Sequence, residues 1–225
     1  MAETLPRIDH LIIGAKDLVA AKEYFLKEYG LQGYDGGKHQ GGWGTENYLI
    51  PLGQGYIEIA AVFDPEAAQT CDWGKLIAST EVTPEKPWKM LTFCCQTKED
   101  AADISKRLNH MLGHMKRVLP GGDYLTWRVA TMSRFHESDR APKPFFITWD
   151  DPSKRPDKRV VEHVADPVGF EYIELSGGES DKAAMKEWIG EGVEGRRLPL
   201  RWVEGPPALK AVGIKTADGK TIVLE

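Results

Sequence analysis

Two ionisable side chains that could do chemistry lie on largely apolar segments near the start of this chain of 225 residues. His10 lies within residues 7–14, beside Asp9, and Glu58 interrupts the apolar run of residues 56–62. A neutral imidazole can bind a metal ion or take up a proton. A carboxylate on a strand that packs a core is costly unless it is paired, hydrogen-bonded or bound to a metal. His10 and Glu58 together predict a site for metal binding or acid–base chemistry.

Both residues also have an ordinary structural interpretation. His10 could be a core histidine whose ring bonds a backbone carbonyl. Glu58 could lie on a wet sheet face or pair with Arg128. We favour the functional interpretation because the two side chains belong to neighbouring strands of one predicted unit.

A glycine-rich segment between these two runs carries further polar and aromatic side chains. Residues 36–44 contain five glycines, with His39 and Trp43 among them and Asn47 shortly after. Glycines let a backbone approach a ligand closely, and such a loop can present N–H donors to an anion. The Gly-Lys-Ser/Thr of nucleotide phosphate loops is absent. His39, Trp43 and Asn47 are therefore predicted to contact a substrate; the alternative is a tight connection plugged by Trp43.

Two charged residues later in the chain complete the candidate set. Arg128 lies on a predicted strand, where its planar fork could clamp a substrate carboxylate. Glu174 alternates with apolar residues in segment 170–175, which directs it to the concave face of its sheet. There it would be a second catalytic carboxylate or a further metal ligand; the alternative is a glutamate that faces solvent.

These side chains require a sheet to bring them together, and the first 63 residues predict one. A strand at residues 7–14 precedes a helix at residues 17–29, which carries an apolar stripe and ends at a glycine. The glycine-rich segment is predicted as a loop between the second and third strands. Residues 45–52 and 56–62 then form a hairpin, which gives a βαβββ unit.

The same order of elements returns twice along the chain. A strand at residues 88–96 and another at residues 170–175 each precede a predicted helix, followed by further strands. We predict an α+β fold of repeated βαβββ modules whose curved mixed sheets form a cup, with helices outside, all packed as one compact domain. The predicted modules are residues 1–63, 88–150 and, as a third module-like unit, 170–225, joined by connections at 64–87 and 151–169.

Composition and charge exclude several classes of protein. The formal net charge of −5 argues against a nucleic-acid partner. No apolar run approaches the ~20 residues of a membrane span. Residues 1–6 lack the basic start and apolar core of a signal peptide, so we expect a cytoplasmic protein. Two of the three cysteines are adjacent, which predicts reduced, buried strand residues.

The order of the motifs resembles a known superfamily. Asp9-His10, Gly36-Gly37-Lys38-His39, Gly42-Trp43-Gly44-Thr45-Glu46-Asn47 and Ile57-Glu58 follow one another as in the vicinal oxygen chelate superfamily, and more narrowly as in its glyoxalase-like domain proteins. A weaker match continues through residues 125–128 and 144–149. The resemblance implies paired βαβββ modules whose sheets enclose a cup-shaped site that often holds a metal.

The resemblance also implies a ligand set for that metal. Members of the superfamily take ligands from the first and last strands of each of two modules. His10 and Glu58 match the pair of the first module and would hold a divalent ion such as Zn, Ni, Mn, Mg or Fe. The second module departs from the pattern, because residues 88–96 contain no histidine and residues 145–149 contain no glutamate.

Three functions from different classes follow. The first is a metal-assisted lyase or isomerase of a small oxygenated metabolite, with Glu58 or Glu174 moving the proton. The second is a metal-free protein that binds or sequesters a small molecule in the same cup, which the missing ligands and the many tryptophans favour. The third is a non-haem iron dioxygenase, which needs a second histidine, His39 or His163. The resemblance implies a homodimer in which modules pair between two chains; the alternative is that the three module-like units pack against one another within one chain.

Overall fold

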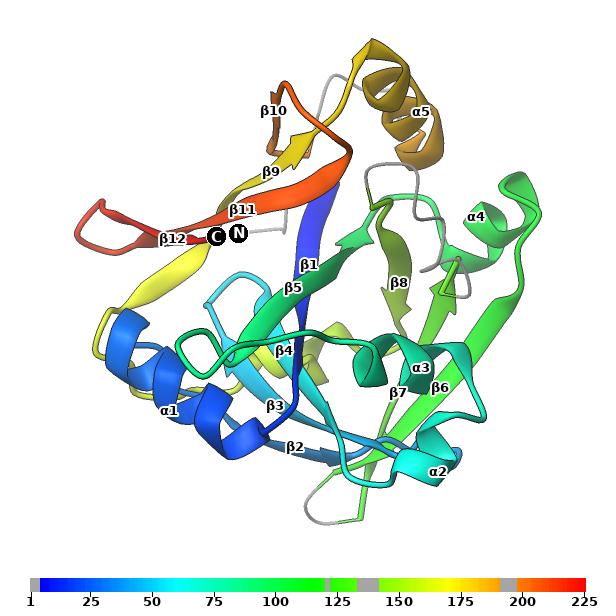
Figure 1. The fold of residues 1–225 in the computed structure, drawn as a ribbon. Helices are drawn as coiled ribbons and strands as arrows, with labels where there is room; N and C mark the ends of the chain where they lie inside the picture. The colour runs from blue at the N-terminus through cyan, green and yellow to red at the C-terminus, as the bar shows by residue number, and fades with distance from the viewer. Residues whose placement is uncertain (1–4, 120–121, 133–141, 191–197) are drawn as a thin grey trace.

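The computed structural model describes residues 5–119, 122–132, 142–190 and 198–225. It is a mixed α+β structure in which an eight-stranded mixed sheet is strongly curled and a four-stranded sheet packs against it (Figure 1). The predicted fold class is therefore confirmed. The polar, charged segment at residues 132–143, for which the sequence predicts a loop, falls mostly on residues 133–141, which lie outside the described residues.

One half of the large sheet comes from the first 62 residues. Its elements are β1 (Arg7–Ala15), α1 (Leu18–Tyr29), β2 (Tyr34–Lys38), β3 (Thr45–Pro51) and β4 (Tyr56–Val62), in the spatial order β2-β3-β4-β1. Asp17 caps α1 by accepting hydrogen bonds from two backbone N–H groups, and Gly30 ends the helix at a φ of 65°. The strand β1 is parallel to β4, so the first and last strands of the unit are neighbours.

The other half repeats this arrangement in reverse. Its elements are β5 (Trp88–Gln96), α4 (Ala101–Arg107), β6 (Leu112–Val118), β7 (Tyr124–Ala130) and β8 (Phe145–Trp149), in the order β5-β8-β7-β6. The strands β1 and β5 pair antiparallel at the centre of the sheet. The two halves are thus related by an approximate twofold axis that runs between β1 and β5.

Strand β6 was not expected from the sequence. The segment from His114 to Arg117 is mostly polar and shows no strand alternation. Leu112 has the spacing that would continue the apolar stripe of the preceding helix. The helix is shorter than that stripe suggests, because Asn109 has a φ of 54° and ends the turn. Leu112 therefore begins a strand.

The connections between the units contain short helices. The first contains α2 (Pro65–Ala68) and α3 (Asp72–Ala78), and the second contains the 3₁₀ turns η1 (Pro152–Lys154) and η2 (Pro156–Lys158). In α3 the buried Trp73 faces the interior, and in η2 Pro156 and Asp157 are buried. Both connections therefore contribute side chains to the interior of the molecule.

The last unit has the predicted order of elements but a different sheet. Its elements are β9 (Pro167–Ser176), α5 (Glu179–Ile189), β10 (Leu200–Val203), β11 (Ala208–Thr216) and β12 (Thr221–Leu224). The spatial order is β10-β9-β11-β12, so its first strand lies inside the sheet and its last strand lies at the edge. The unit is therefore not a third copy of the module. Its Ile173, Leu175 and Val212 share one apolar core with Leu11 and Phe93 of the large sheet.

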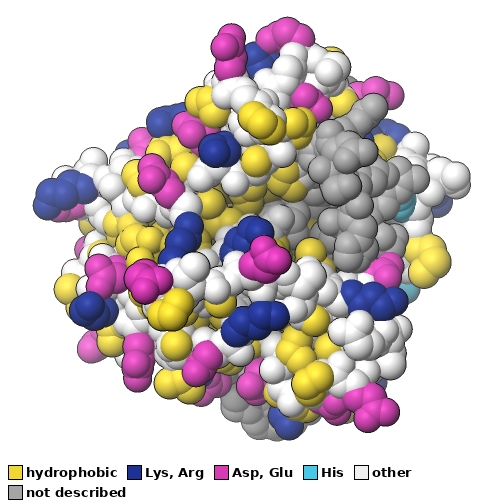
Figure 2. All heavy atoms as spheres, viewed as in Figure 1, with side chains coloured by type: hydrophobic (Ala, Val, Ile, Leu, Met, Phe, Trp, Pro, Cys, Tyr) yellow, Lys and Arg dark blue, Asp and Glu magenta, His cyan; other side chains and the backbone are white. Residues whose placement is uncertain are grey.

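Charged side chains of both signs are interspersed over the face seen in Figure 2, with apolar side chains between them. None of the described helices has the length and apolar character that a membrane crossing requires.

Candidate functional site

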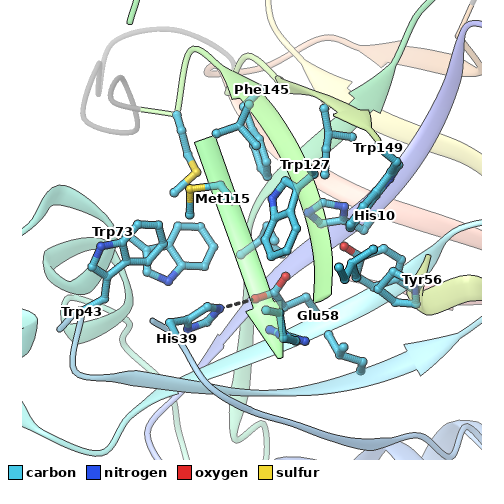
Figure 3. A pocket seen from close by; sticks show the side chains of 18 residues that line it. His10, His39, Trp43, Tyr56, Glu58, Trp73, Met115, Trp127, Phe145 and Trp149 are labelled. Atoms are coloured by element: carbon cyan, nitrogen blue, oxygen red, sulfur yellow. Dashed lines mark hydrogen bonds and ion pairs between the residues drawn. The ribbon is translucent and has the colours of Figure 1, made fainter. Parts of the chain in front are cut away.

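A cavity of about 60 Å³ lies on the concave side of the large sheet (Figure 3). Ligand pockets for drug-sized molecules occupy roughly 300–1,000 Å³, so this cavity suits a ligand or reacting group of only a few atoms. Most of its lining is aromatic or aliphatic. Four side chains that can carry charge also line it: His10, His39, Glu58 and Arg117. The aromatic lining consists of Trp43, Tyr56, Trp73, Trp127, Phe145 and Trp149.

His10 extends into the cavity from β1. Its ring stacks on Tyr56 at a centroid separation of 4.5 Å and meets the edge of Phe145 at 5.3 Å. Its Nδ1 lies 2.7 Å from Oδ1 of the preceding residue, Asp9. Two aromatic rings and one carboxylate therefore fix the orientation of the imidazole.

The ionisation of Asp9 decides which nitrogen of His10 carries the proton. Burial alone would raise the pKa of Asp9, but the hydrogen bond and charge of His10, the charge of Arg7 and the indole N–H of Trp149 together lower it. Trp149 Nε1 donates to Asp9 Oδ2 at 2.9 Å. An ionised carboxylate only accepts hydrogen bonds, so Nδ1 of His10 must donate.

The other ring nitrogen, Nε2, then carries a lone pair when the ring is neutral. Among the described residues, Nε2 of His10 has no hydrogen-bond partner. A histidine whose Nδ1–H is held by a carboxylate and whose Nε2 is open to a cavity has the arrangement of a general base.

Glu58 faces the same cavity from β4, in register with Ile12, two residues beyond His10 on β1. Its Oε1 accepts a hydrogen bond from Nε2 of His39 at 3.0 Å (Figure 3). The same oxygen accepts a second hydrogen bond from Nδ2 of Asn47 at 2.8 Å. Burial would raise the pKa of Glu58, but the hydrogen bond and charge of His39, with the donor of Asn47, lower it to about 2. At neutral pH Glu58 is therefore a carboxylate that accepts hydrogen bonds rather than an acid.

The glycine-rich segment positions these partners. Strand β2 includes Gly36 and Gly37, so only the second part of the predicted loop, residues 39–44, is irregular. A Cβ at Gly36 would lie 2.1 Å from Oδ1 of Asn47, so the absence of a side chain there makes room for the Asn47 amide. His39 Nδ1 lies 2.8 Å from the hydroxyl of Thr45, which leaves Nε2–H to donate to Glu58.

The predicted contacts of the first unit with this cavity are therefore present. His39 and Trp43 line it, and Asn47 contacts its wall through Glu58. Their roles toward a substrate remain predictions, as do the catalytic and metal-binding roles of His10 and Glu58.

Two of the predicted site residues lie elsewhere. Arg128 occupies the face of β7 opposite to Trp127 and forms ion pairs with Asp100 at 2.7 Å and Asp150 at 3.3 Å. Glu174 lies on β9 in the small sheet, in register with Arg201 of β10, and does not line the cavity. Their predicted placement was wrong because side-chain alternation fixes a face but does not tell which sheet, or which side of it, holds the site.

Sequence reasoning missed three side chains at the site. Arg117 and Met115 project from β6 into the cavity, and Trp73 reaches it from α3. Nη2 of Arg117 donates to Oδ1 of Asn47 at 3.3 Å, which places a cation at the cavity wall. The repeat itself was the available signal, because a second βαβββ module needs a strand between its helix and Tyr124.

The approximate twofold axis gives each polar residue of the first half a counterpart in the second. His10 of β1 and Cys94 of β5 are register partners at the centre of the sheet. His10 is also in register with Tyr56 of β4, and Cys94 is in register with Phe145 of β8 in the same way. Cys94 is thus the counterpart of His10. By the same register Ile147 is the counterpart of Glu58, and it lines the cavity. Burial, with the nearby charge of Asp9, raises the pKa of the Cys94 thiol well above its usual value.

A metal centre with two ligands from each half does not fit these side chains. Among the described residues, one group of potential ligands has its donor atoms within 4.8 Å of one another, and it consists of Asp9, His10 and Cys94. Both Asp9 oxygens and the His10 Nδ1 are engaged in hydrogen bonds, and burial raises the pKa of the Cys94 thiol, which disfavours the thiolate that a metal would bind.

Among the described residues, the two histidines proposed as a further iron ligand are engaged in other contacts. His39 Nε2 bonds Glu58, and His163 accepts a hydrogen bond from the backbone of Gln32 away from the cavity.

Comparison with known proteins agrees with the fold. A family model described as a glyoxalase-like domain matches residues 8–193. A hypothetical protein from Staphylococcus aureus is similar in structure, with a TM-score of 0.70, 17% identity, and coverage of 96% of this chain and 93% of that chain. At such identity the likeness concerns the fold alone. No curated protein matches this chain.

Smaller proteins match part of the chain. Methylmalonyl-CoA epimerase from Mycobacterium tuberculosis has a TM-score of 0.43 and 13% identity, and covers 66% of this chain and 91% of its own. A variant of the Streptomyces coelicolor enzyme of the same name has a TM-score of 0.43 and 16% identity, and covers 66% of this chain and 100% of its own.

Proposed function

The chain belongs to the glyoxalase-like domain family of the vicinal oxygen chelate superfamily, and from this premise we propose that it is an acid–base enzyme of the isomerase or lyase type. Its substrate would be a small oxygenated metabolite whose reacting carbon enters the aromatic cavity. The observation that carries the proposal is the lone pair of His10 Nε2, open to the cavity while Nδ1 is held by ionised Asp9.

The chemistry would be removal of a proton from a carbon next to a carbonyl. His10 Nε2 takes the proton, and the electron pair of the C–H bond moves onto the carbonyl oxygen to give an enolate. Asp9 stabilises the imidazolium that forms, because its carboxylate lies 2.7 Å from Nδ1. Return of the proton to a neighbouring atom completes an isomerisation, whereas departure of a leaving group completes an elimination.

The other charged groups orient the substrate and stabilise the enolate. Glu58 accepts a hydrogen bond from a substrate hydroxyl through Oε2, which has no hydrogen-bond partner among the described residues. The guanidinium of Arg117 lies at the wall and provides positive charge for the enolate oxygen. The surrounding tryptophans exclude water, which strengthens both interactions.

Exchange of carbon-bound hydrogen with solvent tests the proposal without knowledge of the full reaction. The purified protein is incubated in D₂O with a panel of small 2-hydroxy and 2-oxo compounds, and loss of C–H signals is followed by NMR. Exchange of at least one compound is expected, with or without a strong chelator. His10→Asn should abolish it, whereas His114→Asn, an exposed histidine of β6, should leave it unchanged.

Failure of every compound to exchange, or exchange that survives His10→Asn, would refute the assignment of His10 as base. Exchange that is lost with chelator and restored by one added metal would show that the base acts on a metal-bound substrate instead.

A second candidate is a protein that binds a small aromatic or apolar molecule without reaction. The second half of the cavity favours it, since Phe145, Ile147 and Val129 offer only apolar contacts. Quenching of tryptophan fluorescence by a ligand that shows no exchange would support this function. The small-molecule partner, the homodimer and a cytoplasmic location remain predictions.

A further inference from the structure

A second, larger cavity adjoins the first. It has a volume of about 560 Å³ and lies between β2, the end of β6 and the segment that contains η1 and η2. Arg117, Leu125 and Pro156 line both cavities, so the two share a wall. A molecule with one end in the small cavity can therefore place its remainder in the larger one, whose volume is within the range of ligand pockets.

The lining of the larger cavity is strongly basic, although the chain as a whole has a formal net charge of −5. Its charged residues are Arg117, Lys154, Arg155, Lys158 and Arg159, against one acid, Asp35. This concentration of one sign contrasts with the mixture of signs on the face in Figure 2.

Some of these charges are already neutralised within the protein. The guanidinium of Arg155 forms a two-pronged contact with Asp157, at 3.0 Å for each oxygen. Lys154 pairs with Asp123. Asp35, the one acid, is itself paired with Lys22. When these ion pairs are set aside, the remaining charge of the cavity lining is positive.

Two guanidinium groups lack a carboxylate partner among the described residues. Arg117 bonds the amide oxygen of Asn47, and Arg159 lies over the ring of Tyr34 at 4.0 Å. A guanidinium that lies over a ring face can still offer N–H groups for a planar, two-pronged contact with an anion. Arg117 stands at the shared wall and Arg159 stands further along the larger cavity.

We propose that the larger cavity binds a phosphate or diphosphate group of the substrate, while the reactive end of the same molecule enters the small cavity. This deepens the proposed function and rests on it for the shared substrate. Arg159 and Lys158 would contact the distal phosphate, and Arg117 would contact the part of the molecule that crosses the shared wall.

Calorimetric titration with inorganic pyrophosphate tests this assignment without turnover. Wild-type protein at fixed ionic strength is expected to bind one pyrophosphate saturably. Arg159→Gln is expected to weaken binding about tenfold, as for loss of one charge-assisted contact. Arg201→Gln is the matched control, because Arg201 lies over Tyr172 at 3.6 Å outside this cavity and should leave binding unchanged.

The outcomes separate the two proposals. Absence of saturable binding, or equal weakening by Arg159→Gln and Arg201→Gln, would overturn the phosphate site whatever happens to hydrogen exchange. Pyrophosphate binding that His10→Asn leaves intact supports the phosphate site, even where hydrogen exchange fails and the proposed base is wrong.

Discussion

The two halves of the large sheet have one topology and opposite chemistry. Strands β1 and β4 present His10 and Glu58 to the cavity, and the related strands β5 and β8 present Cys94 and Ile147 at the corresponding positions. The first half has an ionised carboxylate with two hydrogen-bond donors, whereas the second has a protonated thiol and an aliphatic side chain. Duplication of a fold therefore does not duplicate its site.

The two halves therefore contribute different groups to the cavity. The polar half orients an imidazole and a carboxylate through Asp9, His39 and Asn47, each of which bonds a cavity residue. The apolar half supplies flat, dry walls such as Phe145, which packs edge-on against His10. The base and the carboxylate thus come from one half, whereas the other half supplies most of the apolar enclosure together with one cation, Arg117.

Replacement of the base itself should have the largest effect on the rate of hydrogen exchange. His10→Asn should lower the rate of hydrogen exchange about 10³-fold, because general base catalysis contributes 10²–10⁴-fold. The counterpart substitution, Cys94→Ala, should lower it less than about threefold, since the thiol takes no proton. NMR rates for both variants make the comparison. Equal losses would mean that the two halves contribute alike, and would contradict the division described above.

A loss of stability should follow from neutralising the carboxylate of the polar half. The pKa of Glu58 falls from 4.5 unfolded to about 2 folded, so its contribution is present above pH 4.5 and is lost as pH falls toward 2. Glu58→Gln should therefore remove roughly 3 kcal/mol at pH 7 and much less near pH 2. Urea unfolding across this pH range measures it. A variant with the acid sensitivity of wild type would show that Glu58 is not the group responsible.

The residue behind the base should matter somewhat less than the base. Asp9→Asn keeps an oxygen near Nδ1 but removes the charge that stabilises the imidazolium, so exchange should slow about 10²-fold. The affinity for a bound ligand should change little. An unaltered exchange rate would mean that Asp9 is a structural residue only.

The smallest effect is expected in the apolar half. Ile147→Val should reduce stability by about 1 kcal/mol through lost packing, equally at every pH, because no charge is involved. Urea unfolding at pH 3 and pH 7 provides the comparison with Glu58→Gln. A pH-dependent loss would indicate that the two halves are coupled through the cavity.

The sequence pointed to several polar side chains that line the cavity, but it missed part of the enclosure. His10 and Glu58 could be found because an ionisable residue on an apolar strand is conspicuous, and the order of the motifs added His39, Trp43 and Asn47. Arg117 could not be found in this way, because it follows His114 and Lys116 in a polar run where period-two alternation is invisible. Trp73 reaches the cavity from a connection without a repeat signal.

The same limits explain the misplaced residues. Arg128 and Glu174 satisfy local alternation, but their positions depend on which strands become neighbours, and that is fixed by long-range pairing. The third unit shows this most clearly, since its order of elements is that of a module and its order of strands is not.

The position of the proton on the His10 ring is the most direct test of its role as the base. Nitrogen-15 NMR of the imidazole at neutral pH, with and without added zinc, reports which ring nitrogen carries the proton and whether either binds metal. The expected result is a proton on Nδ1, facing Asp9, and an Nε2 signal that does not respond to zinc. A proton on Nε2, or an Nε2 signal that shifts stoichiometrically with zinc, would contradict it.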